Sequence, residues 1–293
     1  CHCRVQPPNC NPQSAANLDT LIRIMSWVLR IVVAAVALSC STPSDQKPDV
    51  LLITWDTVRA DHVGQPWTPT WNELSEQSAV FTNARTPAPI TLPAHASIMT
   101  GYTPPQHQAR DNGTWPVVST LPTLAERFSD GGWSTGGFIS AAVLDSRYGI
   151  ARGFSTYNDH IPPGVNRTVA HRPGVETVAA AVEWLGDKEM DQAVFMWVHL
   201  FDPHRPWTPS EDPSQSDYQA AIAKADAATS TLIDAFRARG TFESSILVLA
   251  SDHGEGLGEH GEQTHGYFAY DSTIRVPMLM RIGPGNAVAP TKG

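Results

Sequence analysis

The acidic residues and histidines that could do chemistry gather in one stretch of this 293-residue chain, residues 246–265. The stretch opens with the apolar run Ile-Leu-Val-Leu, which predicts a strand buried on both faces. Asp252 and His253 follow directly, and a glycine-rich loop with further acidic residues and His265 comes next. Open α/β sheets build metal and catalytic sites in this way, at the carboxyl ends of core strands. We therefore predict a metal site at Asp252 and His253, with a solvated acidic loop as the alternative.

Two other apolar runs end in residues of the same types. Residues 49–54 predict a first core strand, which ends just before Asp56. Residues 193–198 predict another, which runs into a loop with Asp202 and His204. Because the carboxyl ends of parallel strands share one edge of a sheet, we expect these side chains to converge. Asp56 is then a second metal ligand rather than a turn residue or a helix cap.

A hydroxyl lies at the start of a short helix that is predicted within residues 88–101. Pro93 near the beginning of this segment and Gly101 at its end are typical signals of helix boundaries, and they place Thr91 at the N-cap. An oxygen there faces backbone N–H groups and the positive end of the helix dipole, which favours bound anions. Thr91 is therefore a candidate nucleophile, with a purely capping role as the alternative.

The remaining periodic segments predict an α/β fold. Helices are expected at residues 68–78, with Thr68 as the N-cap, and at residues 121–131, 175–185 and 216–240, and strands at residues 133–140 and 276–282. This succession predicts a mainly parallel central sheet flanked by helices, with the site at the carboxyl ends of the strands. A chain of this length can form one large domain with a sizeable core.

The charge of the chain argues against nucleic acid as a partner. The formal net charge is −9, 17% of the residues are charged, and the sequence has no long run of Lys and Arg. A protein that binds a phosphate backbone needs a concentrated basic surface. We therefore do not expect nucleic-acid binding.

The N-terminal residues carry the features of an export signal. The apolar run at residues 31–38 is much shorter than the about 20 residues that span a membrane. The segment 25–40 ends in Ala-Leu-Ser-Cys, which resembles the cleavage box of bacterial lipoproteins, with Cys40 as the lipidated residue. We expect a periplasmic or cell-surface lipoprotein, with an ordinary cleaved signal as the alternative. The predicted organisation is a spurious or disordered leader (1–24), a signal peptide (25–40), a linker (41–48) and a catalytic domain that is incomplete at its C-terminal end (49–293).

Taken together, these motifs resemble those of the sulfatase family, in the alkaline phosphatase superfamily. The resemblance rests on Ser-Asp-His-Gly-Glu at residues 251–255, on Tyr-Asp-Ser-Thr-Ile-Arg-Val-Pro at residues 270–277 and on His-x-x-Asp-Pro-His-x-Pro at residues 199–206, in the order of the family. It implies an alkaline-phosphatase-like fold without the family's usual smaller C-terminal subdomain. It also implies a metal-dependent enzyme that hydrolyses sulfate or phosphate esters of small molecules or glycans.

The resemblance further implies a role for each candidate residue. Four residues would surround a divalent ion (Ca, Mn or Zn): Asp56, Thr91, Asp252 and His253. Three would contact the oxygens of the ester: His95, Asn112 and, as a second candidate beside Asn112, Arg110. Two are candidates to protonate the leaving alcohol: His204 and His265. One ion is expected; a second, held by Asp202, His204 and His265 as in the two-metal phosphodiesterases of the superfamily, is the alternative.

Departures from the family pattern bear on the chemistry. A formylglycine nucleophile needs Cys or Ser as its precursor, and this chain has Thr91. A Thr hydroxyl must be activated by a metal ion or a base, and a phospho-Thr is hydrolysed more readily than a Thr-sulfate. Thr57 replaces a second acidic ligand, and histidines at positions 265 and 95 replace a Lys and an Arg, which favours zinc over calcium. Phosphate, phosphodiester or phosphonate esters are thus favoured, with a phosphoryl transferase or a non-catalytic binding lipoprotein as alternatives.

Overall fold

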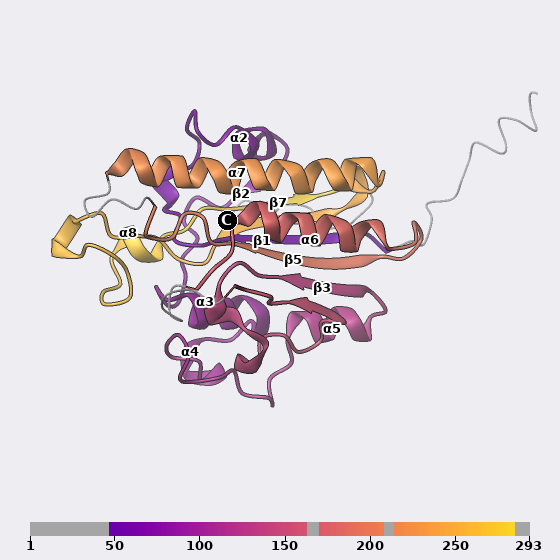
Figure 1. The fold of residues 1–293 in the computed structure, drawn as a ribbon, viewed down its shortest axis with the longest axis horizontal. Coiled ribbons are helices and arrows are strands. Elements are labelled where there is room, and N and C mark those ends of the chain that lie inside the picture. Colours follow the sequence, from indigo (N-terminus) through magenta and orange to yellow (C-terminus); the bar gives the residue numbers. More distant parts are fainter. Residues whose placement is uncertain (1–46, 163–169, 208–213, 285–293) are drawn as a thin grey trace, which may run out of the picture. The chain divides into compact units, whose positions relative to one another are not determined.

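The computed structural model describes residues 47–162, 170–207 and 214–284, all within the part of the chain that starts at Gln46 (Figure 1). The predicted leader, the signal peptide and most of the linker lie outside the described residues. Within the described ranges, no helix combines the length and the apolar character that a membrane crossing requires.

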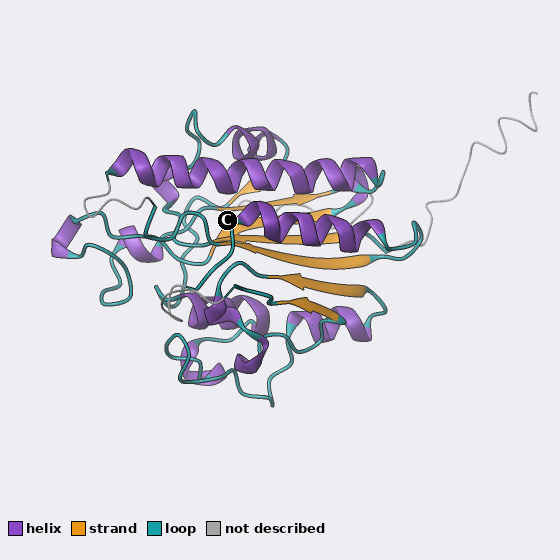
Figure 2. Ribbon diagram, in the orientation of Figure 1, coloured by secondary structure: helices purple, strands orange, loops and turns teal. Residues whose placement is uncertain are grey.

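The described residues form a central sheet with the strand order β2-β7-β6-β1-β5-β3-β4 (Figure 2). The strands are β1 (Val50–Trp55), β2 (Ala79–Val80), β3 (Ser134–Phe138), β4 (Thr156–Asn158), β5 (Val194–Leu200), β6 (Ile246–Ser251) and β7 (Met278–Ile282). Pairing is parallel from β6 to β4, and antiparallel where β7 joins β6 and β2. The prediction of a mainly parallel sheet is confirmed, with an antiparallel edge.

Helices cover both faces of the sheet. Figure 1 shows α2, α6 and α7 on one face and α3, α4 and α5 on the other. Their bounds are α2 (Pro69–Glu76), α3 (Thr91–Thr100), α4 (Pro104–His107), α5 (Leu124–Asp130), α6 (Gly174–Gly186), α7 (Gln215–Ala238) and α8 (Asp271–Ile274). The predicted helix at residues 121–131 starts later than expected, because Thr123 and Glu126 form a capping box at its N-terminus.

Strand β1 lies at the centre of two hydrophobic clusters. Leu51, Ile53 and Trp55 point to the cluster under α6 and α7, whereas Val50 and Leu52 point to the cluster that includes α3 and α5. Every residue of β1 is buried, as expected for a parallel strand that is covered on both faces. The position of its last residue is therefore tightly fixed by packing.

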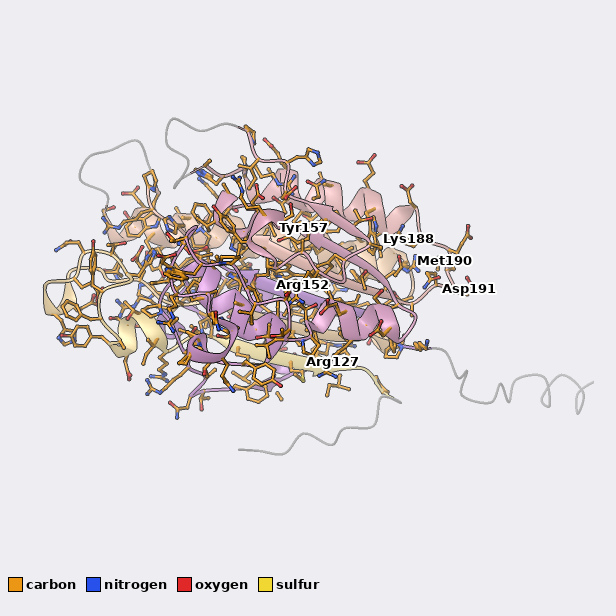
Figure 3. All side chains as sticks on the ribbon, turned by 90° about the horizontal axis from the view of Figure 1, so that it is seen from below. Arg127, Arg152, Tyr157, Lys188, Met190 and Asp191 are labelled. Carbon is orange, nitrogen blue, oxygen red and sulfur yellow. The ribbon has the colours of Figure 1, made fainter. Side chains whose placement is uncertain are left out.

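The loop between α4 and α5, which carries two of the predicted substrate-binding residues, is fastened to the rest of the fold. The guanidinium of Arg152 (labelled in Figure 3) donates hydrogen bonds to the carbonyl oxygens of Val118, Ser119 and Leu121 at 3.2, 2.9 and 2.8 Å. The backbone N–H of Val118 donates to the carbonyl oxygen of His107 at 3.1 Å. These contacts hold the loop against Arg152 and the end of α4.

Candidate active site

The register of the central strands brings two aspartates together. In the parallel pair β1 and β6, Trp55 is aligned with Ser251, so that Asp56 and Asp252 follow at the same edge of the sheet. The backbone N–H of Asp252 donates to the carbonyl oxygen of Trp55 at 3.1 Å, which continues the ladder by one step. Both carboxylates are completely buried. The predicted convergence of these two strand ends is thus present in the structure.

Each aspartate uses one carboxylate oxygen within the protein and leaves the other without a donor among the described residues. Oδ2 of Asp56 accepts a hydrogen bond from Nε2 of His199 at 3.1 Å. Oδ1 of Asp252 accepts from the backbone N–H groups of Thr57, at 3.1 Å, and of His253, at 2.7 Å. The opposite oxygens, Oδ1 of Asp56 and Oδ2 of Asp252, are buried and have no hydrogen-bond partner there. These are groups that require a positive charge nearby.

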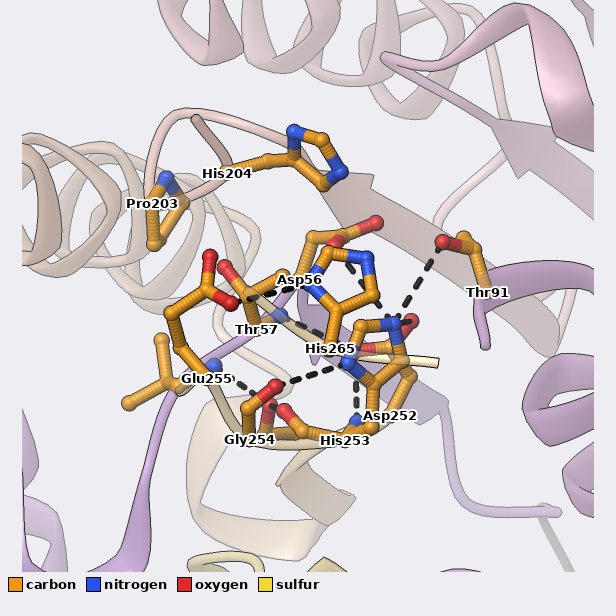
Figure 4. Close-up of polar contacts among 12 residues, drawn as sticks. Asp56, Thr57, Thr91, Pro203, His204, Asp252, His253, Gly254, Glu255 and His265 are labelled. Carbon is orange, nitrogen blue, oxygen red and sulfur yellow. Dashed lines mark hydrogen bonds and ion pairs between the residues drawn. The ribbon is translucent and has the colours of Figure 1, made fainter. Parts of the chain in front are cut away.

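His253 adds a third acceptor to the same place. Its Nδ1 lies 2.9 Å from the carbonyl oxygen of Gly254, which can only accept, so Nδ1 carries the proton. The lone pair on Nε2 then faces Oδ2 of Asp252 at 3.5 Å, Oδ1 of Asp56 at 3.9 Å and the hydroxyl of Thr91 at 3.5 Å (Figure 4). With both carboxylates ionised, these three acceptors have no proton between them and cannot bond to one another, whereas a cation would satisfy all three.

The donor set fits one divalent cation. The candidate ligand atoms of Asp56, Asp252 and His253 all lie within 4.8 Å of one another. Ligands bound to zinc at about 2.0–2.2 Å in a tetrahedron are about 3.4 Å apart, close to the separations seen here. A second group of converging ligand atoms, from His95, His199 and Asp252, fits less well, because both histidines already use their ring nitrogens in hydrogen bonds within the protein.

The pKa shifts of the three candidate ligands are consistent with a bound cation. Burial raises the pKa of Asp56 to about 8, although the nearby His265 opposes the shift. Burial and the adjacent Asp56 carboxylate raise the pKa of Asp252 well above its usual range. Burial likewise lowers the pKa of His253 well below 6.5, which keeps its imidazole neutral. A cation would offset the free-energy cost of burying both carboxylates in their ionised form. It would also bind the neutral imidazole as a ligand.

Thr91 lies beside this group, at the start of α3. It is the first residue of the helix, and Ile90 is the N-cap, so the predicted capping role of Thr91 is wrong. The backbone N–H of Leu92 is instead satisfied by Oδ1 of Asn112 at 2.8 Å. The Thr91 hydroxyl is therefore left to face Nε2 of His253, as the nucleophile prediction requires. The same bond places the Asn112 amide next to Thr91.

His95, which is predicted to contact the oxygens of the ester, uses both ring nitrogens in hydrogen bonds within the protein. Its ring is completely buried, with Nε2 3.0 Å from the hydroxyl of Thr54 and Nδ1 2.8 Å from the carbonyl oxygen of Thr91. Because Nε1–H of Trp197 donates to the same Thr54 hydroxyl, that hydroxyl gives its own proton to Nε2. His95 thus ties α3 to β1 and fixes the backbone of Thr91. Its predicted contact with the oxygens of the ester stays a prediction.

Three further residues with predicted roles lie in different surroundings. Asp202 is not assigned as a metal ligand, because its carboxylate accepts the backbone N–H of Gly174, at 3.0 Å for Oδ2, and caps α6. Arg110 is exposed on its loop. His204 lies over the site, stacked on Phe201 with ring centroids 4.2 Å apart, and its Nδ1 lies 2.5 Å from the carbonyl oxygen of Arg205. Burial lowers the pKa of His204 to about 3.

His265 reaches the site from the glycine-rich loop. Its ring lies 4.4 Å from that of His253 and 5.1 Å from that of His204, and Nδ1 is 3.0 Å from Oε1 of Glu255. Burial alone would lower the pKa of His265, but the Glu255 carboxylate raises it above 6.5. Neither Glu255 nor His199 was assigned a role from the sequence. Their only signal was their position, next to predicted ligands at two strand ends.

Comparison with known proteins agrees with the fold and the motifs. The family profile described as Sulfatase matches residues 48–292. A Delta 4,5-hexuronate-2-O-sulfatase of Bacteroides thetaiotaomicron is 22% identical over 305 residues, covering 83% of this chain and 63% of that protein. Ectonucleotide pyrophosphatase/phosphodiesterase family member 1 of Rattus norvegicus is 27% identical over 242 residues, covering 78% and 26%.

Solved structures show the same fold. The phosphonate monoester hydrolase of Agrobacterium radiobacter superposes with a TM-score of 0.64 at 19% sequence identity, over 80% of this chain and 68% of that chain. The chain spans less than two thirds of the length of the curated relatives it matches.

Proposed function

The chain belongs to the sulfatase family, and from this premise we propose that it is a metal-dependent hydrolase of phosphate, phosphodiester or phosphonate esters. Sulfate esters are the second substrate class. The observation that carries the proposal is the convergence of three candidate ligand groups, from Asp56, Asp252 and His253, beside the hydroxyl of Thr91. An oxygen nucleophile next to a cation site is the minimum that this chemistry requires.

A divalent ion held by Asp56, Asp252 and His253, with the Thr91 hydroxyl beside them, would lower the pKa of that hydroxyl and offset the negative charge of the ester. Because one of the ligands is an imidazole nitrogen, zinc or manganese fits this set better than calcium, which prefers oxygen ligands only. One ion is proposed. A second ion on Asp202 loses support, because the carboxylate of that residue caps α6.

The side chains around Thr91 support a two-step reaction. Thr91 releases its hydroxyl proton to solvent, Oγ1 attacks phosphorus, the new O–P bond forms, and the bond to the ester oxygen breaks. Nε2–H of His265 gives its proton to the departing oxygen, and the Asn112 amide binds an oxygen of the transferred group. Water then attacks the phosphorus of phospho-Thr91, the bond between phosphorus and Oγ1 breaks, and phosphate or its monoester is released. Oγ1 takes up a proton from solvent, which restores the hydroxyl. The imidazole of His265 accepts a proton from this water and is ready for the next cycle.

Phosphorus is favoured over sulfur because of the nucleophile. A Thr-sulfate lacks the easy elimination that an aldehyde hydrate provides, whereas a phospho-Thr can be hydrolysed with metal assistance. A phosphodiesterase and a phosphonate monoester hydrolase among the similar proteins are compatible with this preference. Because a sulfatase from Bacteroides thetaiotaomicron is also among the similar proteins, sulfated small molecules or glycans are the alternative substrates.

The nucleophile is tested with two substitutions at one position. Thr91→Ala should lower kcat by at least about 10³-fold, as loss of a nucleophile does in other hydrolases. Thr91→Ser, the matched control, keeps an oxygen at the same place and should remain active. Both variants should bind metal and unfold at a temperature close to that of the wild type. Equal activity of Thr91→Ala and the wild type would contradict the proposal. It would favour the alternative of a non-catalytic binding protein.

The substrate class is tested separately, with an aryl phosphate, an aryl phosphodiester and an aryl sulfate that share one leaving group. The expected order of kcat/KM places the phosphorus esters above the sulfate. A sulfate ester that is hydrolysed fastest would show that the Thr chemistry does not set the preference.

Export remains part of the proposal and rests on residues 25–40 alone. We propose that the chain is secreted in a bacterium and anchored through lipid on Cys40. Mass spectrometry of the membrane-extracted protein should show a lipidated N-terminal cysteine, and Cys40→Ser should release the protein from the membrane. An unmodified Cys40 would point to an ordinary cleaved signal.

A further inference from the structure

We propose that Glu255 is a positioning residue: it orients the ring of His265 so that Nε2 faces Thr91 and the leaving group. This inference rests on the proposed function of His265. Glu255 lies in the glycine-rich loop after β6, and its side chain is completely buried. Its Oε1 is 3.0 Å from Nδ1 of His265.

The contact fixes which nitrogen of His265 faces the site. An ionised carboxylate only accepts hydrogen bonds, so the proton between the two groups belongs to Nδ1. The other ring nitrogen, Nε2, then lies on the side of Thr91 (Figure 4). Orientation of an imidazole by a carboxylate on its distal nitrogen is the logic of the catalytic triad, applied here to a different nucleophile.

The surroundings of His265 leave its orientation to Glu255. The ring lies against those of His253 and His204, at centroid distances of 4.4 and 5.1 Å, and 11% of the side chain is exposed. These ring contacts, one tilted and one edge-on, do not distinguish the two nitrogens of an imidazole. Hydrogen bonds do, and the short one at Nδ1 comes from Glu255, with the hydroxyl of Thr264 more distant at 3.3 Å.

A purely structural role does not explain a carboxylate at this position. Oε1 also accepts the backbone N–H of the next residue, Gly256, at 3.1 Å, whereas Oε2 is buried and has no partner among the described residues. Burial of a charge with one oxygen unpaired is costly, and a neutral side chain of similar shape would fill the same volume. The hydrogen bond to Nδ1 of His265 is the interaction that gives the Glu255 side chain a role here.

The first test determines the tautomer of His265 and does not depend on catalytic activity. The metal-free protein, labelled with ¹⁵N-histidine, is studied by NMR at a pH at which His265 is neutral, and His265→Asn identifies the signals of this residue. Wild type should show His265 protonated on Nδ1. Glu255→Ala should shift it toward the Nε2 tautomer, and Glu255→Gln, whose carbonyl can still accept, should restore the wild-type pattern. A wild-type His265 protonated on Nε2 would overturn the proposal, even if the variants fail to fold.

The second test uses leaving groups. Loss of a general acid typically costs about 10²-fold or more when the leaving group needs a proton. His265→Asn and Glu255→Ala should therefore both lose much more activity toward an alkyl ester than toward a p-nitrophenyl ester, and the double variant should be no worse than the poorer single variant. Equal losses on both esters, or losses that multiply in the double variant, would contradict the proposal.

Glu262→Gln is the matched control, because Glu262 is a buried glutamate of the same loop whose Oε1 accepts the backbone N–H groups of Tyr267 and Phe268, both at 3.2 Å. It should not change the dependence on the leaving group. A wild type that is inactive on every ester would refute the proposed function, whereas the tautomer measurement would still decide the role of Glu255.

Discussion

The Asp56 carboxylate is buried beside a second carboxylate, and this makes the stability of the metal-free protein depend on pH. The pKa of Asp56 is about 8 in the folded state, against about 3.9 for an exposed aspartate. Between these values the folded state keeps a proton that the unfolded state has released. The free energy of unfolding should therefore fall as the pH rises from about 4 to about 8.

The measurement is urea unfolding of chelator-treated protein from pH 5 to pH 8, for wild type and Asp56→Asn. Asn at this position cannot titrate, so the decrease with pH should be smaller in the variant. Asp234→Asn, at an exposed position on α7, is the control and should follow the wild type. Parallel curves for wild type and Asp56→Asn would contradict the assigned shift.

We expect His199 to support the proposed metal site through Asp56 rather than by direct contact with the ion. Its Nε2–H donates to Oδ2 of Asp56, and its Nδ1 accepts from the backbone N–H of Ser140 at 3.4 Å. Loss of a hydrogen-bond partner of a metal ligand typically weakens metal binding by about 10–100-fold. His199→Ala should show such a loss in a competition titration with zinc, whereas the exposed His160→Ala should not. Unchanged affinity in His199→Ala would mean that Asp56 does not bind the ion.

Single-residue predictions succeeded where chemistry follows directly from a local pattern. Asp56 and Asp252 each follow an apolar run, and Thr91 begins a helix with clear boundary signals, so their convergence could be predicted from the sequence. His95 and Asp202 also lie in motifs that resemble those of the sulfatase family, and their side chains could likewise bind a substrate or a metal ion. Their partners, Thr54 for His95 and Gly174 for Asp202, are distant in the sequence, and no local pattern reveals them.

Helix α2 is stabilised at its start by a residue from another element. Thr68 is at the N-cap, as predicted, but its hydroxyl bonds to the backbone of Gln65 rather than to the helix. The carboxylate of Asp226, from α7, accepts the N–H groups of Thr70 and Trp71 instead, both at 2.9 Å. This long-range cap could not be predicted from the sequence, since capping rules describe only neighbours.

Asp226→Ala should lower the free energy of unfolding by about 1–2 kcal/mol, the usual cost of a lost helix cap. Asp234→Ala, on the same helix but exposed, should change it by less than about 0.5 kcal/mol. Chemical denaturation of both variants provides the comparison. A loss in Asp226→Ala no larger than in Asp234→Ala would show that the two hydrogen bonds contribute little.

The order of the strands determines where the chemistry is located in the molecule. β1 lies between β5 and β6, so three segments distant in the sequence end at one edge of the sheet. Hydrophobic periodicity predicted β1, β3, β5, β6 and β7 but not the short strands β2 and β4, and it carries no information about which strands are neighbours. The resemblance to the sulfatase family implied the fold as a whole, and the structure confirms that fold.

The central claim is that one divalent cation lies among Asp56, Asp252 and His253, next to the hydroxyl of Thr91. Crystals grown with zinc, with anomalous diffraction recorded on both sides of the zinc absorption edge, test it directly. The account predicts an anomalous peak at about 2.0–2.2 Å from a ligand atom of each of the three residues and adjacent to Oγ1 of Thr91. A zinc-saturated protein without a peak at this position would contradict it.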